Sequence, residues 1–174
     1  VFLSLEFLKL QRKLEETGRY LLSTEREALQ KAYDNKDVFG DYYLPGLLLS
    51  EALWPNHYKF GQVFTEVFLS SLAANAKVLE VGVGTGYHLD ILLDEKPDSS
   101  YIGIDISDYS ISFANRYSTE GKQRKIKPKF LKQNISDGLY FEDNSFEAII
   151  MGEIIEHIER PSDAIEEAYR VLKP

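Results

Sequence analysis

Three glycines at alternate positions, Gly82, Gly84 and Gly86, lie between a short apolar run and a helix-forming stretch. The apolar run, residues 77–81, is typical of a strand that is covered on both faces. Glycine allows positive φ angles and lets a ligand come close to the backbone, and a helix beginning near Tyr87 directs free N–H groups toward the same space. The spacing therefore predicts a loop that binds a nucleotide-like cofactor.

Two carboxylates accompany this loop. Glu80 is on the strand just before it, and Asp105 ends a second buried-strand run about 20 residues beyond the last glycine. A carboxylate at the end of the neighbouring strand is placed to accept both hydroxyls of a ribose. A dinucleotide loop would read G-x-G-x-x-G, but Tyr87 occupies the third glycine position, so a nicotinamide-dependent oxidoreductase is the weaker alternative.

A third group of residues that could take part in catalysis follows the fourth apolar run. Glu153, Glu156 and His157 stand at i, i+3 and i+4, so a helical turn would place them on one face. His157 could act as a general base near neutral pH. Two carboxylates and an imidazole could instead bind Mg²⁺ or Mn²⁺. In the third interpretation the carboxylates favour a helix start and His157 fills a gap beneath it.

The pattern E-x-G-x-G-x-G, with Asp105 at its spacing, resembles motif I of the class I S-adenosylmethionine-dependent methyltransferases. Residues 134–151 also resemble the family's D-A-x-x-L-P-F-x-D-x-S-F-D-x-V, with Asn134 in place of the common acid. The resemblance implies that Asn134 bonds the adenine amino group and that the Ile135 backbone meets the ring. The side-chain oxygen of Asn134 can still accept that proton. The implied cofactor-binding residues are Glu80, Gly82, Gly84, Gly86, Asp105, Ile106, Asn134, Ile135 and Met151.

The E-x-x-E-H sequence from Glu153 to His157 resembles a motif of the ubiquinone-biosynthesis O-methyltransferases and of small-RNA 3′-end 2′-O-methyltransferases. This resemblance implies Glu156 and His157 as catalytic residues, with a divalent metal held by Glu153, Glu156 and His157 as a less favoured option. The RNA enzymes complete their metal site with a later histidine, and no histidine follows His157 here.

The favoured function is transfer of a methyl group from S-adenosylmethionine to a small-molecule acceptor, with the methylated atom left open. Met151-Gly-Glu-Ile stands where Asn/Asp-Pro-Pro-Tyr would follow the fourth strand in a base-amino methyltransferase, so methylation of nucleic-acid bases is not expected. The alternatives are an RNA 2′-O-methyltransferase and a cofactor-binding subunit without catalysis.

Composition narrows the possible classes of function further. The 174 residues carry a net charge of −8 and the pI is about 5.0, which argues against a nucleic-acid footprint over the whole surface. The basic connector, residues 122–129, is expected to be a solvated loop, with phosphate binding as the alternative. The absence of cysteine fits a reducing compartment, so we expect a cytoplasmic protein. Residues 1–9 are too short and too soon charged for a signal peptide or membrane span.

The alternation of apolar runs with helical stretches predicts a Rossmann-like, doubly wound, mainly parallel α/β sheet in residues 73–174. We expect strands at about 78–81, 101–105, 129–133 and 146–151, and helices at 87–95, 108–119 and from Ser162, with Ser107 and Ser162 as N-caps. The start at Val1 suggests trimming, and the resemblance implies three further strands after Pro174.

Residues 1–72 are expected to form a helical appendage, with helices at 24–36, 47–54 and 57–72 and a loop at 40–46. The last helix carries an apolar stripe of Phe60, Val63, Phe64, Val67 and Phe68. In the resembled family this region often folds over the cofactor. The candidates for such a lid are Tyr42, Tyr43, Trp54, His57, Tyr58 and Phe60. The alternative is that these aromatic residues form the core of the appendage, and that His57 is an ordinary surface histidine.

Overall fold

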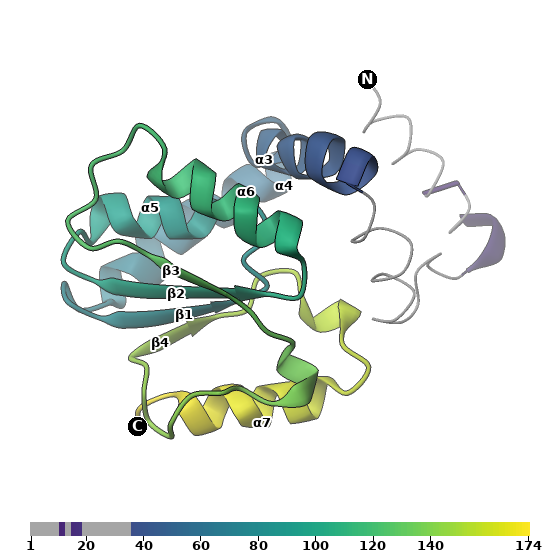
Figure 1. The fold of residues 1–174 in the computed structure, drawn as a ribbon. Helices are drawn as coiled ribbons and strands as arrows, with labels where there is room; N and C mark the ends of the chain where they lie inside the picture. The colour runs from purple at the N-terminus through teal and green to yellow at the C-terminus, as the bar shows by residue number, and fades with distance from the viewer. Residues whose placement is uncertain (1–10, 13–14, 19–35) are drawn as a thin grey trace.

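The computed structural model describes residues 11–12, 15–18 and 36–174. Nearly all of the helix expected at 24–36 lies outside these residues. The described part is built on a sheet of four parallel strands in the order β3-β2-β1-β4 (Figure 1). The strands are β1 (Lys77–Val81), β2 (Ser100–Asp105), β3 (Lys129–Lys132) and β4 (Ala148–Ile150).

Helices cover both faces of this sheet. α5 (Tyr87–Glu95) and α6 (Asp108–Thr119) lie on one face, and α7 (Pro161–Val171) lies on the other (Figure 1). The bounds of α5 and α6 are those expected from the sequence, and the Rossmann-like, doubly wound arrangement is confirmed. The fourth strand is shorter than expected, since it spans Ala148–Ile150, and Phe146 forms an isolated parallel bridge with Leu172.

Of the two serine N-caps expected from the sequence, the structure has one. The Ser107 side chain accepts a hydrogen bond from the Ser110 N–H at the start of α6, as predicted. The prediction of Ser162 as an N-cap is wrong, because Arg160 occupies the cap and Pro161 the first helical position. Proline suits that position since its N–H would have no intrahelical partner there.

Side chains of β1 alternate between two cores. Val78 packs among residues of α5 and the helical segment before the sheet, whereas Leu79 and Val81 pack against residues of α7 and β2. All three are almost completely buried. Both faces of a parallel strand are covered in this way, which explains the continuous apolar run in the sequence.

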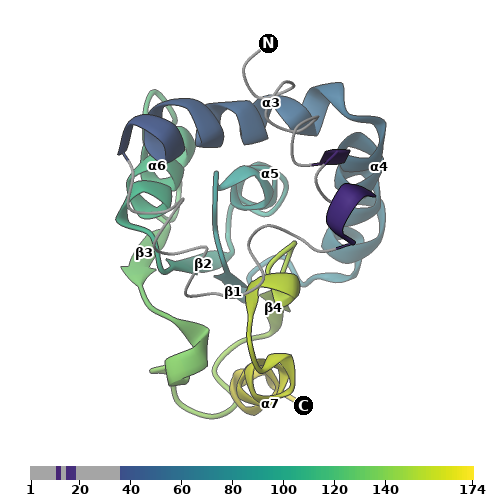
Figure 2. The same ribbon diagram turned by 90° about the vertical axis from the view of Figure 1, so that its right-hand side faces the viewer.

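The segment before the sheet is helical from residue 36 onward. It comprises a π-helical segment η2 (Lys36–Tyr43), α3 (Leu44–Leu53), α4 (Pro55–Val63) and a second π-helical segment η3 (Phe64–Leu69). The loop expected at 40–46 is therefore wrong, since Pro45 lies in the first turn of α3, where proline is tolerated. Figure 2 shows α3 and α4 on the same side of the sheet as α5 and α6.

The expected apolar stripe of the last of these helices is only partly buried. Phe64 is 6% exposed and packs in the core with Phe68 beside it, as expected. Phe60, Val63 and Val67 are each more than half exposed among the described residues. Periodicity identified an amphipathic helix but overestimated how much of its apolar face is covered.

The basic connector is not a freely solvated loop. Lys122 and Arg124 both form ion pairs with Asp90 of α5, and Arg124 also pairs with Asp94. The Arg124 side chain is only 6% exposed. The ion pairs neutralise much of the positive charge that suggested a phosphate site. Separately, none of the helices in the described ranges is both long and apolar enough to cross a membrane.

The Glu167–Arg170 ion pair of α7 forms hydrogen bonds with residues 139–143. Glu167 accepts hydrogen bonds from the Leu139 N–H at 2.8 Å and from Arg170 Nε at 2.9 Å. Arg170 in turn donates to the carbonyls of Leu139 and Phe141 at 2.8 and 2.9 Å. The Arg170 guanidinium, helped by the Leu139 N–H, lowers the pKa of Glu167 from its usual 4.5 to about 2.

We predict that Glu167→Gln lowers the free energy of unfolding by about 1 kcal/mol at pH 7, a low value because the pair is partly exposed. The folded-state pKa lies below the unfolded one, so the carboxylate stabilises the fold fully above pH 4.5 and less as the pH falls toward 2. Urea unfolding of both proteins should therefore show a difference at pH 7 that shrinks toward pH 2.

Glu166→Gln is the matched control, because Glu166 is an exposed neighbour on the same helix. It should leave the unfolding curve within about 0.5 kcal/mol of the wild type at each pH. A Glu167→Gln deficit that does not change with pH would show that the carboxylate charge is not the source of the stabilisation.

Candidate functional site

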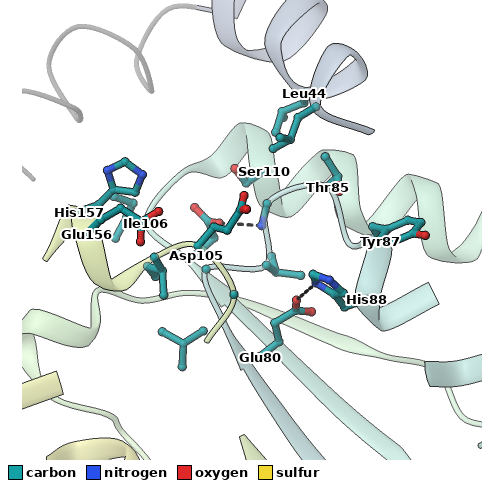
Figure 3. Close-up of a pocket in the computed structure, with 18 of the residues that line it drawn as sticks. Leu44, Glu80, Thr85, Tyr87, His88, Asp105, Ile106, Ser110, Glu156 and His157 are labelled. Carbon is teal, nitrogen blue, oxygen red and sulfur yellow. Dashed lines mark hydrogen bonds and ion pairs between the residues drawn. The ribbon is translucent and has the colours of Figure 1, made fainter. Parts of the chain in front are cut away.

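The carboxyl ends of the strands surround a cavity of about 390 Å³. Loops after all four strands line it, and α3 and α4 supply the remaining wall. Such a volume is in the usual range for small-molecule sites, about 300–1,000 Å³. Figure 3 shows Leu44 reaching from α3 toward Asp105 and the glycine loop, with Glu156 and His157 on another side of the same space.

The three glycines of the loop all have positive φ angles, of 75°, 51° and 77°. A Cβ on Gly82 would come within 2.5 Å of Ile154, and one on Gly86 within 3.0 Å of Ala114. A Cβ on Gly84 would meet only the Gly82 carbonyl, at 3.9 Å, and Gly84 lines the cavity. Internal packing therefore requires Gly82 and Gly86 to be small, whereas Gly84 leaves its free space for a ligand.

Asp105 lies at the end of β2 beside this loop and is 7% exposed. One carboxylate oxygen accepts a hydrogen bond from the Gly84 N–H at 3.0 Å (Figure 3). The other accepts one from the Ser107 N–H at 2.9 Å. Burial raises the pKa of Asp105, and these backbone N–H groups oppose the increase. Asp105 thus lines the cavity and also fixes the loop.

Glu80 is buried beneath the loop. It accepts a hydrogen bond from the Tyr101 hydroxyl. Its other oxygen is 3.4 Å from His88 Nδ1 (Figure 3). Burial raises the pKa of Glu80, while hydrogen bonding to Glu80 raises the pKa of His88 against the effect of its own burial. In the described part of the chain the other ring nitrogen, His88 Nε2, is buried without a hydrogen-bond partner.

Asn134 and Ile135 lie at the end of β3, and both line the cavity with Ile106 from the end of β2. The Asn134 side-chain oxygen already accepts a hydrogen bond from the Ser136 N–H at 2.9 Å. A carboxamide oxygen has two lone pairs and can accept more than one hydrogen bond.

Two expected cofactor residues lie outside the cavity wall. Gly86 starts α5 and packs against α6, so it shapes the turn without facing the cavity. Met151 lines a shallower depression that includes Phe60 and Val67, and it packs against the core on the α7 face. Counting along the strand did not show which way the chain turns at residue 151.

The shared helical face expected for Glu153, Glu156 and His157 is wrong. Glu153 has a left-handed φ of 50° and precedes the short 3-10 turn η5 (Ile155–His157). All three side chains are exposed, and all three line the cavity. His157 therefore does not fill a gap beneath a helix. Across the ranges that the structure describes, no three His, Cys, Asp or Glu side chains are grouped so that they could hold a metal ion.

The α3–α4 wall combines apolar and ionisable residues. Leu44, Leu47 and Phe60 of these helices line the cavity beside Tyr43, the last residue of η2, and so do Glu51 and His57. Tyr42, Tyr58 and Phe60 are each more than half exposed, which does not fit an aromatic core of an appendage. Sequence reasoning passed over His88 and Glu51, and it offered His57 both as a candidate for covering the cofactor and as an ordinary surface histidine. The adjacency of His88 to the glycine loop was the one signal in the sequence.

The fold and the cavity are those of the class I S-adenosylmethionine-dependent methyltransferases. The family model described as "Methyltransferase domain" matches residues 79–174, more than half of the chain, and the chain belongs to this family. The glycine loop, Asp105 and the Asn134 segment lie within the match. The open space at Gly84 and the ring of polar groups around it fit the cofactor of this class.

Among curated proteins, the chain is 28% identical over 165 residues to the sterol 24-C-methyltransferase erg6 of Schizosaccharomyces pombe, covering 87% of this chain and 43% of that protein. It is 30% identical over 115 residues to the ubiquinone/menaquinone biosynthesis C-methyltransferase UbiE of Dinoroseobacter shibae, covering 65% and 45%. The chain thus spans less than half the length of these relatives.

Solved structures include an S-adenosylmethionine-dependent methyltransferase from Aquifex aeolicus, with a TM-score of 0.52, 25% identity and coverage of 63% of this chain and 58% of that one. A Haloferax volcanii structure of the methyltransferase activator Trm112 with a methyltransferase gives a TM-score of 0.61, 22% identity and coverage of 83% and 57%. At that identity the second likeness concerns the fold alone.

We predict that Gly84→Val abolishes binding of S-adenosylmethionine in calorimetry while the chain still folds, because the added side chain projects into the cavity and not into the core. The positive φ should cost on the order of 1–3 kcal/mol of stability, measured in a circular-dichroism melt.

Gly121→Val is the matched control. Gly121 has a φ of 70°, nothing lies within 4 Å of its Cβ position, and it does not line the cavity. It should lose similar stability and bind the cofactor normally. A folded Gly84→Val protein with normal affinity would mean that the loop is not the cofactor cradle.

Proposed function

We propose that this protein transfers a methyl group from S-adenosylmethionine to a small-molecule acceptor. The observation that carries the proposal is the open side of Gly84 facing the same cavity as the buried carboxylate of Asp105. When bound, the cofactor supplies a methyl group activated by its positively charged sulfur. The task of the protein is then mainly to hold both reactants in line, which can be worth roughly 7 to 11 kcal/mol.

Each wall of the cavity has a part in this task. Asp105 accepts the ribose hydroxyls, and Asn134 bonds the adenine amino group beside Ile135. The carboxyl group of Glu80 lies beneath the loop, where it is hydrogen-bonded to the Tyr101 hydroxyl and close to His88. Leu44, Leu47 and Phe60 cover the cavity from α3 and α4 and keep water from the reacting atoms.

A small, largely apolar acceptor fits this wall best. The names of two relatives refer to sterols and to quinone biosynthesis, and both are apolar classes of molecule. Nucleic acid fits less well, because the connector's Lys122, Arg124 and Lys125 are all paired with carboxylates. An RNA 2′-O-methyltransferase and a cofactor-binding subunit without catalysis stay as alternatives, and the cytoplasmic location stays a prediction.

We predict that Asp105→Asn weakens binding of S-adenosylmethionine and S-adenosylhomocysteine by about 1.5 to 3 kcal/mol, roughly 10- to 150-fold in affinity, through loss of charge-assisted hydrogen bonds to ribose. Calorimetry measures the affinity. Both carboxylate oxygens accept backbone N–H bonds, so the NH2 of the amide would face one of these donors, and we expect a loss of stability of about 1–3 kcal/mol that a circular-dichroism melt measures.

Ser107→Ala serves as the control, because the Ser107 side chain caps α6 while its backbone N–H still reaches Asp105. It should lose about 1 kcal/mol of stability and keep its cofactor affinity. Unchanged affinity in folded Asp105→Asn would refute the ribose assignment. Cofactor binding without turnover of small phenols, carboxylates, amines or RNA would favour the non-catalytic alternative.

A further inference from the structure

His57 of α4 is held by the neighbouring helix. Its side chain is 15% exposed, and its Nδ1 lies 3.0 Å from the hydroxyl oxygen of the buried Ser50. That hydroxyl donates its only proton to the Leu47 carbonyl at 2.6 Å. The Ser50–His57 bond must therefore take its proton from Nδ1, because neither oxygen can supply another. The edge of Trp54, 5.1 Å away between ring centroids, fixes the ring orientation.

This hydrogen bond decides what the other ring nitrogen can do. In neutral His57 the proton is on Nδ1, so Nε2 carries a free lone pair. Nε2 lies 3.9 Å from a carboxylate oxygen of Glu153, on the loop after β4, and His57 and Glu153 both line the cavity. The lone pair is therefore available on the cavity side, where a ligand proton could be accepted.

Two carboxylates face this imidazole from different elements. Glu51 of α3 is 3.7 Å from Nδ1, and Glu153 faces Nε2. The Glu80–His88 pair lies beyond Glu51, and Tyr43 faces Glu153. The His57 imidazole thus lies between one carboxylate on its Nδ1 side and another on its Nε2 side.

We propose that His57 is the general base of this site and that the acceptor is an apolar small molecule with a hydroxyl group; this rests on the proposed methyl transfer. The hydroxyl oxygen loses its proton to Nε2 as it bonds to the methyl carbon. The sulfur–methyl bond breaks with its electron pair kept by sulfur, which becomes a neutral thioether. The imidazolium then releases its proton to water. Ser50 acts as a positioning residue through the tautomer that it selects.

His157 competes for this role. It also lines the cavity, but its side chain is exposed and its bond to the Ile154 carbonyl at 2.9 Å is made by the backbone N–H. His57, in contrast, is mostly buried and has a hydrogen bond that selects its tautomer. The apolar residues of the α3–α4 wall, Leu44, Leu47 and Phe60, line the same cavity and suit a phenol-like ring.

Histidine ring nitrogens in the ¹⁵N-labelled chain test the geometry directly. Long-range ¹H–¹⁵N spectra above the imidazole titration should show the Nδ1–H tautomer for the signal that His57→Gln removes. Ser50→Ala should shift that signal toward the Nε2–H tautomer, and Ser50→Thr, which keeps the hydroxyl, should restore it. An Nε2–H tautomer in the wild type would overturn the proposal.

Turnover tests the chemistry, with 4-nitrophenol, catechol and 1-naphthol as probes and release of S-adenosylhomocysteine as the readout. His57→Gln should lose roughly 10²- to 10⁴-fold in kcat and the ascending limb of the rate–pH profile. Its affinity for S-adenosylmethionine in calorimetry should stay within about twofold of the wild type, a difference of under about 0.5 kcal/mol. Ser50→Ala should show a smaller loss in kcat, reversed in Ser50→Thr.

The outcomes separate the two proposals. Wild-type turnover in His57→Gln, or a loss found in His157→Gln alone, would overturn the role of His57. A wild-type protein that binds S-adenosylmethionine but methylates none of the hydroxyl probes would overturn the inferred acceptor class and leave the proposed cofactor use standing. A failure to bind the cofactor would overturn the proposed function itself.

Discussion

The turn after β1 is bonded to the end of β2, and the geometry of the cavity depends on this connection. The Gly82 and Val83 N–H groups donate to the Ile104 carbonyl at 2.8 and 3.0 Å, and the Gly84 N–H donates to Asp105. These bonds require the positive φ angles that glycine adopts at little cost. They hold the loop against the neighbouring strand, so that its open side and the Asp105 carboxylate face the same space.

The charges around this space are mostly negative. Burial and the nearby Asp105 raise the pKa of Glu80, and Glu51, Glu153 and Glu156 line other parts of the cavity. Such a cavity attracts ligands with positive charge and repels polyanions. The ion pairs of the connector remove the nearest basic run, which strengthens the same preference. Electrostatics and packing therefore both favour a small acceptor next to a cationic cofactor.

The α3–α4 wall makes the site more than a cofactor cradle. It contributes the apolar cover of Leu44 and Phe60, and it brings Ser50 and His57 to the side of the cavity facing Glu153. The position and the tautomer of the imidazole depend on two helices that meet at Trp54, between the end of α3 at Leu53 and the start of α4 at Pro55. The chemistry proposed for this site thus depends as much on this wall as on the glycine loop.

The sequence by itself determined the parallel sheet, the bounds of α5 and α6, the glycine loop and the position of Asp105. Each of these can be predicted from patterns that are local in the chain: apolar periodicity, glycine sterics and the short distance from a strand to its following helix. Tertiary structure decided the left-handed turn at Glu153, the ion pairs of Arg124, and the meeting of Ser50, His57 and Glu153. Those features join side chains from separate elements, whose approach depends on how helices cross the sheet and not on spacing along the sequence.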